Sequence, residues 1–132
     1  MTRNEITEHR ESKVSLIADT AAVEKLRTYL AECKLHAKAE PDSQMLIEGL
    51  ENEIADMEMT IQKRTEELKE HENAVRISLK AMSDRTSRVA ASMYYCNGLS
   101  WAEVGSILHV SEGAIRARVR RAIIGAGILW EK

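Results

Sequence analysis

The chain has 132 residues, a length that fits one small domain or one domain carried on a helical stalk. It contains no Phe and a single Pro, 44% of its residues are hydrophobic and 30% are charged. Because it lacks the β-branched and aromatic runs that strands prefer, this composition predicts an all-α protein. No apolar run approaches the roughly 20 residues of a membrane-spanning helix, so we expect no membrane partner.

Charge is distributed unevenly along the chain. The formal net charge is −2, with 12 basic and 17 acidic side chains in residues 1–81 but seven basic and four acidic in residues 82–132. An acidic N-terminal part disfavours wrapping by nucleic acid. The cationic C-terminal part is therefore the candidate region for binding an acidic partner.

Residues that could support catalysis, metal binding or disulfides are scattered. Cys33 and Cys96 have no CxxC spacing, so we expect no disulfide and a reducing cytoplasm, in keeping with an N-terminus that does not resemble a signal peptide. No two histidines stand four apart, and there is no phosphate-binding glycine loop. We therefore expect no metal, no cofactor and no enzymatic activity. The histidines are His9, His36, His71 and His109.

A first helix is predicted over about residues 3–38. Thr2 and Glu5 have the spacing of a capping box, which places its start near the N-terminus. Ile6 and Val14 stand alone among charged residues, so the first turns are expected to fray. Apolar residues then recur every seven positions, with two more at intermediate steps, and form a coiled-coil-like seam. The seam residues are Leu16, Val23, Leu26, Leu30, Cys33 and Ala37.

A second, longer helix is predicted over about residues 43–82, after a turn at Glu40 to Ser43 that Pro41 favours. Six apolar residues occupy one heptad position without a break: Ile47, Ile54, Ile61, Leu68, Val75 and Met82. The partner position is apolar at Leu50 and Met57 and then polar, at Arg64, His71 and Ser78. We interpret these polar residues as the part of the α-helical seam that lies beyond the end of the first helix, where apolar packing is no longer needed. The alternative is that they form a polar strip that binds a partner.

The two helices are expected to form an antiparallel hairpin, residues 1–82, in which the first helix covers the Ile47–Leu68 half of the second. A two-helix hairpin leaves one face of each helix open. We therefore predict that two or more chains associate through the hairpin, a homodimer being favoured. The predicted oligomerisation residues are Ile47, Leu50, Ile54, Met57, Ile61, Leu68 and Val75.

A C-terminal domain of three helices is predicted over residues 83–124. Ser83-Asp84 offers an N-cap for a helix from Arg85 to Asn97, whose Val89, Met93 and Cys96 should point inward. The tail, residues 125–132, is expected to dock on its own domain or on a neighbour. The remaining core residues are Leu99, Val104, Leu108, Val110, Ile115 and Val119.

The second and third helices of this domain have the pattern of a helix-turn-helix. Ser100 and Glu103 form a capping-box pair after Gly98, which supplies a left-handed helix end. Gly105 has no side chain to keep a crossing helix away. His109-Val110 make the turn, and Ser111 is the N-cap of the last helix, residues 112–124.

The exposed face of this last helix has small side chains near its N-terminus and cationic side chains further along. With about 100° per residue, Gly113, Ala117, Arg120 and Arg121 lie opposite the stripe that holds Ile115. Ala114 and Arg116 lie on the shoulders. Small residues allow close approach to base edges, and arginine pairs with guanine or phosphate, so the helix suits the DNA major groove. The alternative is a solvated basic helix in a protein–protein module.

Two segments carry a family resemblance: Gly98-Leu99-Ser100-Trp101 and the run from Val110 to Ala122. They resemble the domain of bacterial sigma factors, especially the extracytoplasmic-function group, that reads the upstream promoter element. His109 stands where that family usually has Gly. The wider layout is similar to small phage and prophage transcription regulators. The resemblance implies DNA binding near a promoter and contact with RNA polymerase. The N-terminal part has no aromatic-basic promoter-melting segment, so we do not expect a complete sigma factor.

The leading hypothesis is therefore a sequence-specific transcription regulator that binds double-stranded DNA. A DNA-packaging protein like the phage small terminase subunits, or a helical scaffold without DNA binding, are the alternatives. Trp101 either approaches the DNA backbone or shields the core, and Tyr94 and Tyr95 are expected to brace it. The predicted DNA-contacting residues are Ser100, Trp101, Ser111, Glu112, Gly113, Ala114, Arg116, Ala117, Arg118, Arg120 and Arg121.

Overall fold

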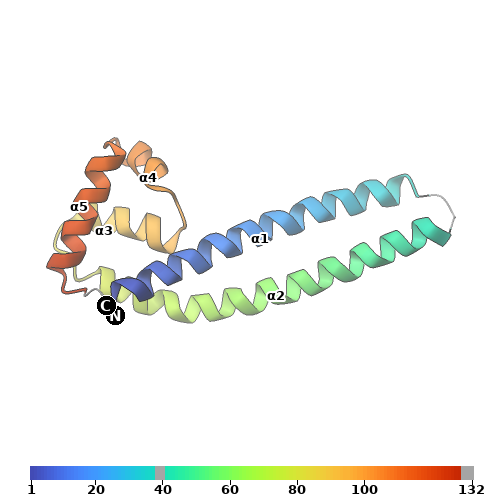
Figure 1. Ribbon diagram of the computed structural model, residues 1–132, viewed down its shortest axis with the longest axis horizontal. Helices are drawn as coiled ribbons and strands as arrows, with labels where there is room; N and C mark the ends of the chain where they lie inside the picture. The colour runs from blue at the N-terminus through green and yellow to red at the C-terminus, as the bar shows by residue number, and fades with distance from the viewer. Residues whose placement is uncertain (38–40, 129–132) are drawn as a thin grey trace. The chain divides into compact units, whose positions relative to one another are not determined.

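A computed structural model describes residues 1–37 and 41–128 of the chain and contains only helices in those segments. The helices are α1 (Arg3–Leu35), α2 (Pro41–Leu79), α3 (Arg85–Ala91), the π-helical turn η1 (Ser92–Cys96), α4 (Trp101–Leu108) and α5 (Glu112–Gly125) (Figure 1). The predicted all-α class, with two long helices followed by a helical C-terminal region, is confirmed. No helix in the described segments has both the length and the apolar character needed to cross a bilayer.

The chain divides into two compact units. One, called here the C-terminal unit, combines Met1–Val14 with Glu67–Lys132; the other, the hairpin unit, is Ser15–Glu66. Both long helices contribute residues to both units. The division into domains after residue 82 stays a prediction.

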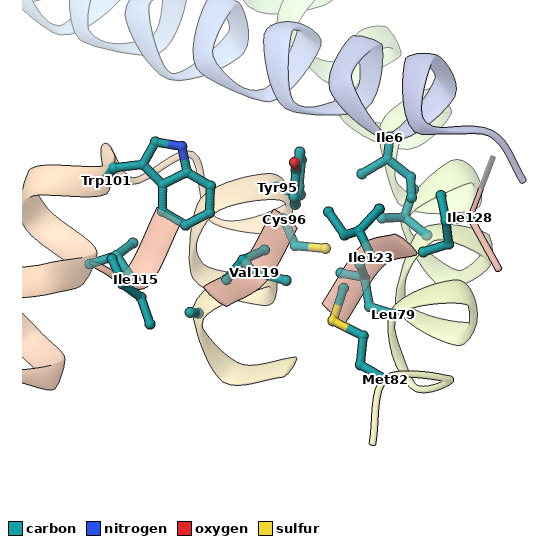
Figure 2. Close-up of a cluster of buried hydrophobic side chains, with 14 residues drawn as sticks. Ile6, Leu79, Met82, Tyr95, Cys96, Trp101, Ile115, Val119, Ile123 and Ile128 are labelled. Carbon is teal, nitrogen blue, oxygen red and sulfur yellow. The ribbon is translucent and has the colours of Figure 1, made fainter. Parts of the chain in front are cut away.

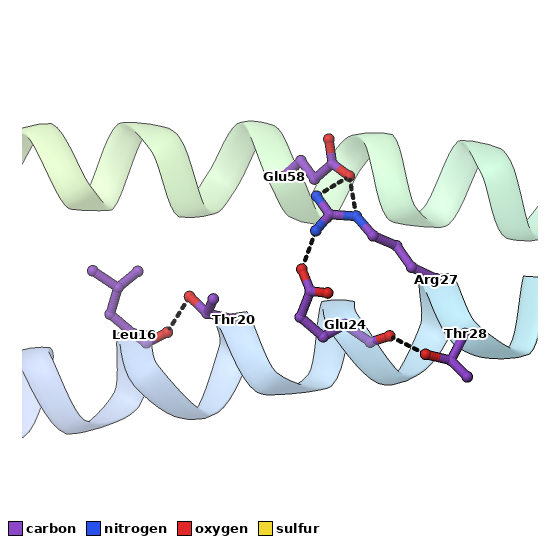
Figure 3. A network of polar contacts seen from close by, with 6 residues as sticks. All are labelled: Leu16, Thr20, Glu24, Arg27, Thr28 and Glu58. Carbon is purple, nitrogen blue, oxygen red and sulfur yellow. Dashed lines mark hydrogen bonds and ion pairs between the residues drawn. The ribbon is translucent and has the colours of Figure 1, made fainter.

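In the hairpin unit, α1 packs against α2 through part of the predicted seam. Leu16, Val23 and Ile54 are buried there. Polar side chains flank these contacts: Arg27 binds Glu58 across the two helices and Glu24 within α1, as Figure 3 shows. Pairs of this kind, half-exposed to water, contribute little each. Burial of the aliphatic side chains therefore dominates the stability of the hairpin.

Two of the three polar residues of the predicted seam, Arg64 and His71, contact α1 rather than lying beyond its end, which corrects the sequence interpretation; Ser78 donates to the Ala74 carbonyl within α2. Arg64 donates to Asp19 at 2.6 Å and to Ser15 at 3.1 Å. In the C-terminal unit, Nδ1 of His71 lies 3.0 Å from Nδ1 of His9. The favoured interpretation is wrong for Arg64 and His71 because α1 supplies polar partners for them, and the pattern of α2 alone does not show which residues of α1 lie opposite.

The helix boundaries differ slightly from those predicted. Helix α2 begins at Pro41 rather than Ser43, because proline is well suited to the first turn, where no backbone N–H is required. It ends at Leu79 rather than Met82. The predicted turn residue Glu40 and the predicted end of the first helix at residue 38 lie outside the described residues.

The core of the C-terminal unit is built around α5 (Figure 2). Val119 and Ile123 of α5 are 1% exposed, and Ile128, after the helix, is 6% exposed. The same cluster includes Ile6 of α1 and Val75 of α2, both fully buried. The expectation that the first turns of α1 fray is therefore wrong, since Ile6 packs into a core that sequence patterns within residues 1–40 cannot reveal.

The segment before α4 is not one continuous α-helix. Helix α3 passes into the π-helical turn η1, in which the backbone N–H of Asn97 reaches the carbonyl oxygen of Ser92 at 3.1 Å. The wider π-turn rotates the residues on either side of it relative to an ideal α-helix. Val89, predicted to point inward, is 44% exposed, whereas Cys96, also predicted inward, is fully buried.

Candidate nucleic-acid interface

Helix α4 begins with the predicted capping box. Glu103 donates its backbone N–H to Oγ of Ser100 at 3.2 Å, and Ser100 donates its own to Oε1 of Glu103 at 3.1 Å. Gly98, two residues earlier, has a φ of 76°, the left-handed conformation expected for it. These local interactions fix where α4 starts, and in them the Ser100 hydroxyl oxygen acts as an acceptor.

The turn between α4 and α5 is tight. His109 adopts the left-handed conformation, with φ 57° and ψ 40°, the backbone geometry that glycine adopts most readily at the end of a helix. A Cβ atom on Gly105 would lie 2.6 Å from the carbonyl oxygen of Val110. Glycine at position 105 therefore allows the turn to pass directly over α4.

Helix α5 begins and packs as predicted. Oγ of its N-cap residue Ser111 accepts the backbone N–H of Ala114 at 3.3 Å. Ile115 and Val119 are buried, and Ile123, which the sequence pattern missed, extends the same stripe. This stripe anchors α5 and leaves its other face exposed.

Every residue of α5 that was predicted to contact DNA is exposed. At the N-terminal end they are small apart from Glu112, and four arginines follow within six positions. The N–H groups of the first turn add the positive end of the helix dipole. The exposed set is Glu112, Gly113, Ala114, Arg116, Ala117, Arg118, Arg120 and Arg121.

One of these arginines has a strong partner within the C-terminal unit. Arg118 donates to both carboxylate oxygens of Asp84, from Nε at 2.6 Å and from Nη2 at 3.0 Å. Asp84 is also the N-cap of α3 and accepts from the hydroxyl of Ser87. The hydrogen bond from Arg118, with that from Ser87, lowers the pKa of Asp84 to about 2. Arg118 thus links α5 to the start of α3.

Trp101 lies against the core. It is 9% exposed, and its indole stacks on the Tyr94 ring with centroids 3.9 Å apart. The guanidinium of Arg10 covers the Tyr94 ring at 3.9 Å from its centroid, while Arg10 also donates to the backbone carbonyl of Leu99 at 3.3 Å. Of the two roles considered for Trp101, this packing matches the shielding of the core.

A surface hollow of about 330 Å³ lies beside two of the exposed arginines. Arg116 and Arg120 of α5 line it together with Arg3, Asn4 and Thr7 of α1. Three arginines therefore line one hollow, and guanidinium groups are well suited to binding anions such as phosphate. Sequence reasoning missed Arg3, because no local signal connects the start of the chain with α5.

The helix-turn-helix also matches a known family. The family model of sigma-70, region 4, matches residues 85–123, which contain α3, η1, α4 and most of α5. The C-terminal region carries a sigma-factor-like helix-turn-helix. Sigma-70 region 4 is a DNA-binding domain, so the match indicates DNA binding by these residues. Comparisons with curated proteins and with solved structures give no significant match to the chain.

Proposed function

We propose that this protein is a sequence-specific regulator of transcription that inserts α5 into the major groove of double-stranded DNA. The observation that carries the proposal is the exposed face of α5, which is small at the capped N-terminal end and rich in arginine beyond it. The match of residues 85–123 to sigma-70 region 4 supports the same conclusion.

Each exposed group of α5 has a proposed role. The Gly113 and Ala117 positions let the helix approach base edges, and Arg121 reaches bases or phosphate from the same side. Arg116 and Arg120 contact phosphates along the adjoining hollow. The N-terminal end of α5 binds a further phosphate through backbone N–H groups of its first turn. Phosphate contacts of this kind make affinity dependent on salt.

Two residues predicted to contact DNA receive a different role. Arg118 holds α5 on the N-cap of α3 through Asp84, and Trp101 packs on Tyr94. We assign both to positioning the helix-turn-helix rather than to contacting DNA.

We also propose that the protein dimerises through the hairpin unit, but through residues other than those predicted from the sequence. Of the predicted oligomerisation residues, Ile54 and Val75 are buried within a single chain, and the others are partly covered. Apolar side chains that remain exposed are better candidates for contacts between chains. In the hairpin unit they include Ile17, Tyr29, Leu35, Met45, Leu46 and Met59.

We further propose a biological setting of phage or prophage gene control, in which the bound protein contacts RNA polymerase near a promoter. This setting rests on the resemblance of the sequence to sigma-like regulators. Bacterial two-hybrid contact with polymerase subunits tests it directly. If no polymerase subunit interacts with the protein, the proposed contact with polymerase is wrong, while the proposed DNA binding is unaffected.

The proposed DNA binding is tested by selecting bound sequences from a pool of random duplexes. Enrichment of one motif in two symmetric copies is expected for a dimer, with affinity falling steeply as salt increases. Enrichment of one unpaired motif would retain sequence-specific binding and contradict the dimer. Failure to retain any duplex at low salt would contradict the proposed function and favour a scaffold.

A further inference from the structure

Three potential metal ligands from distant parts of the sequence meet inside the C-terminal unit. His9 of α1, Glu72 of α2 and Cys96 of η1 each present one ligand atom, and these atoms all lie within 4.8 Å of one another. His9 is 2% exposed and Cys96 is fully buried. A buried imidazole and a buried thiol, with a partly buried carboxylate at such spacing, form a donor set typical of transition-metal sites in proteins.

The His9 ring supplies a second, independent observation. Its Nδ1 atom lies 3.0 Å from Nδ1 of His71, so that nitrogen has a partner. Its Nε2 atom is buried and has no hydrogen-bond partner. A buried polar atom without a partner costs free energy unless something binds it. The unpartnered Nε2 is therefore the His9 nitrogen that needs a ligand.

We propose that His9, Glu72 and Cys96 bind a divalent transition-metal ion, for which Zn²⁺ fits the mixed nitrogen, oxygen and sulfur donors best. Nε2 of His9 coordinates the ion, while Nδ1 donates its proton to His71 and fixes the tautomer, as the outer partners of metal-bound histidines do. Three protein ligands leave a fourth tetrahedral position for water or another donor.

Burial sets the protonation of two of these ligands in the metal-free site, where Glu72 also pairs with Arg76 at 3.6 Å. Burial lowers the pKa of His9, which keeps the imidazole neutral and able to coordinate. Burial raises the pKa of the Cys96 thiol, so the metal-free site holds the proton that a metal would displace. A divalent ion with one thiolate and one carboxylate is neutral overall, which reduces the cost of burying the charges.

Such an ion would connect α1, α2 and η1. His9 lies in the same part of α1 as Ile6, which packs into the core of the C-terminal unit, and as Thr7, which lines the hollow beside α5. Metal binding would therefore stabilise the unit that holds the helix-turn-helix, because binding free energy to the folded state adds to folding free energy. The inference does not depend on DNA binding and can fail or succeed separately from it.

The test uses the full chain without a histidine tag, stripped of metal by a chelator and then titrated with Co²⁺. We expect tetrahedral d–d absorption bands and a near-ultraviolet thiolate-to-cobalt band that saturate at one ion per chain, and displacement of both by Zn²⁺. Zn²⁺ should also raise the thermal midpoint of the metal-free protein. Absence of the thiolate band in the wild-type protein would overturn the proposal.

Variants identify the ligands. Cys96→Ser should abolish the thiolate band, whereas the matched control Cys33→Ser, which changes the half-buried cysteine of the hairpin unit, should leave it unchanged. Glu72→Gln changes a partly exposed side chain, so it tests the site even if Cys96→Ser does not fold. We expect it to weaken Co²⁺ binding at least tenfold. Unchanged Co²⁺ affinity in folded Glu72→Gln, or loss of the band in Cys33→Ser, would contradict the assigned ligands.

Discussion

At the scale of single residues, the helix-turn-helix depends on side chains that set backbone geometry. Ser100 and Ser111 cap the two helices, His109 takes the left-handed turn position, and Gly105 gives the turn room to pass. None of these residues needs to touch DNA to be required for binding. Their effect is to fix the direction in which α5 presents its arginines.

Gly105→Ala is expected to destabilise the protein. Its Cβ would lie 2.6 Å from the Val110 carbonyl oxygen, and that backbone cannot move without displacing the start of α5. Overpacking of this kind costs about 1–3 kcal/mol. Gly113→Ala is the matched control, because a Cβ there meets nothing within 4 Å and alanine favours a helix. Urea unfolding of both variants checks this, and equal stabilities would contradict the close packing.

The Asp84–Arg118 pair predicts a specific pH dependence. The pKa of Asp84 falls from 3.8 to about 2 in the folded protein, chiefly through the hydrogen bond from Arg118. The carboxylate form therefore stabilises the fold at pH values above 3.8, and this contribution is lost as the pH falls through about 2. Asp84→Asn should lower the thermal midpoint at neutral pH, and the gap to wild type should narrow below about pH 4. A gap independent of pH would contradict the ion pair as its cause.

At the scale of helices, the start of α1 belongs to the core of the C-terminal unit. Ile6 is fully buried there, and Arg10 covers Tyr94, which in turn stacks on Trp101. Helix α1 therefore supports the aromatic group at the start of α4. The helix-turn-helix is thus packed against residues from both ends of the sequence.

Ile6→Ala should consequently destabilise the C-terminal unit. Removing a buried isoleucine side chain costs about 2–5 kcal/mol, whereas Ile77→Ala, at a position of α2 that is 67% exposed, should cost far less. Denaturant unfolding followed by Trp fluorescence measures both. Similar small losses in the two variants would show that α1 does not contribute to this core.

Sequence patterns predicted the local features of these helices better than their contacts. The caps at Ser100 and Ser111 and the positive φ of Gly98 follow from short-range rules, and the structure has all of them. Burial of Ile6 and the pairing of His9 with His71 depend on residues more than sixty positions apart. The sequence pattern likewise did not indicate the π-helical turn, because such turns are rare, and the regular helix predicted from Arg85 to Asn97 placed the exposed Val89 on the inner side.

At the scale of the whole molecule, the chain combines an acidic N-terminal part with a cationic helix-turn-helix. The sequence predicted this combination and its all-α class because both follow from composition and periodicity. It could not distinguish residues that pack within one chain from residues left for a second chain, since both are apolar. Exposure in the structure makes that distinction. Ile54, with 6% of its surface exposed, packs within the chain, whereas Met59, with 71% exposed, is left for a second chain in the proposed dimer.

The proposed dimer gives a prediction about mass in solution. Sedimentation equilibrium should give twice the chain mass at micromolar concentration, and Met59→Glu should shift the protein toward monomer. Met57→Leu, a conservative change at a partly covered position, serves as a control that keeps the apolar character. A monomeric wild-type protein at that concentration would contradict dimerisation, and a ring of many subunits would favour the packaging alternative.

The central claim is that the exposed face of α5 binds duplex DNA. The most direct measurement is the affinity of the charge-reversed double variant Arg116→Glu/Arg120→Glu for the selected duplex, by fluorescence anisotropy. Lys25→Glu/Lys63→Glu, at exposed positions of the hairpin unit, changes the net charge equally and serves as the control. We predict at least a hundredfold loss for the first variant with its helical content retained, and little change for the second. Equal affinities for the two folded variants would contradict the claim.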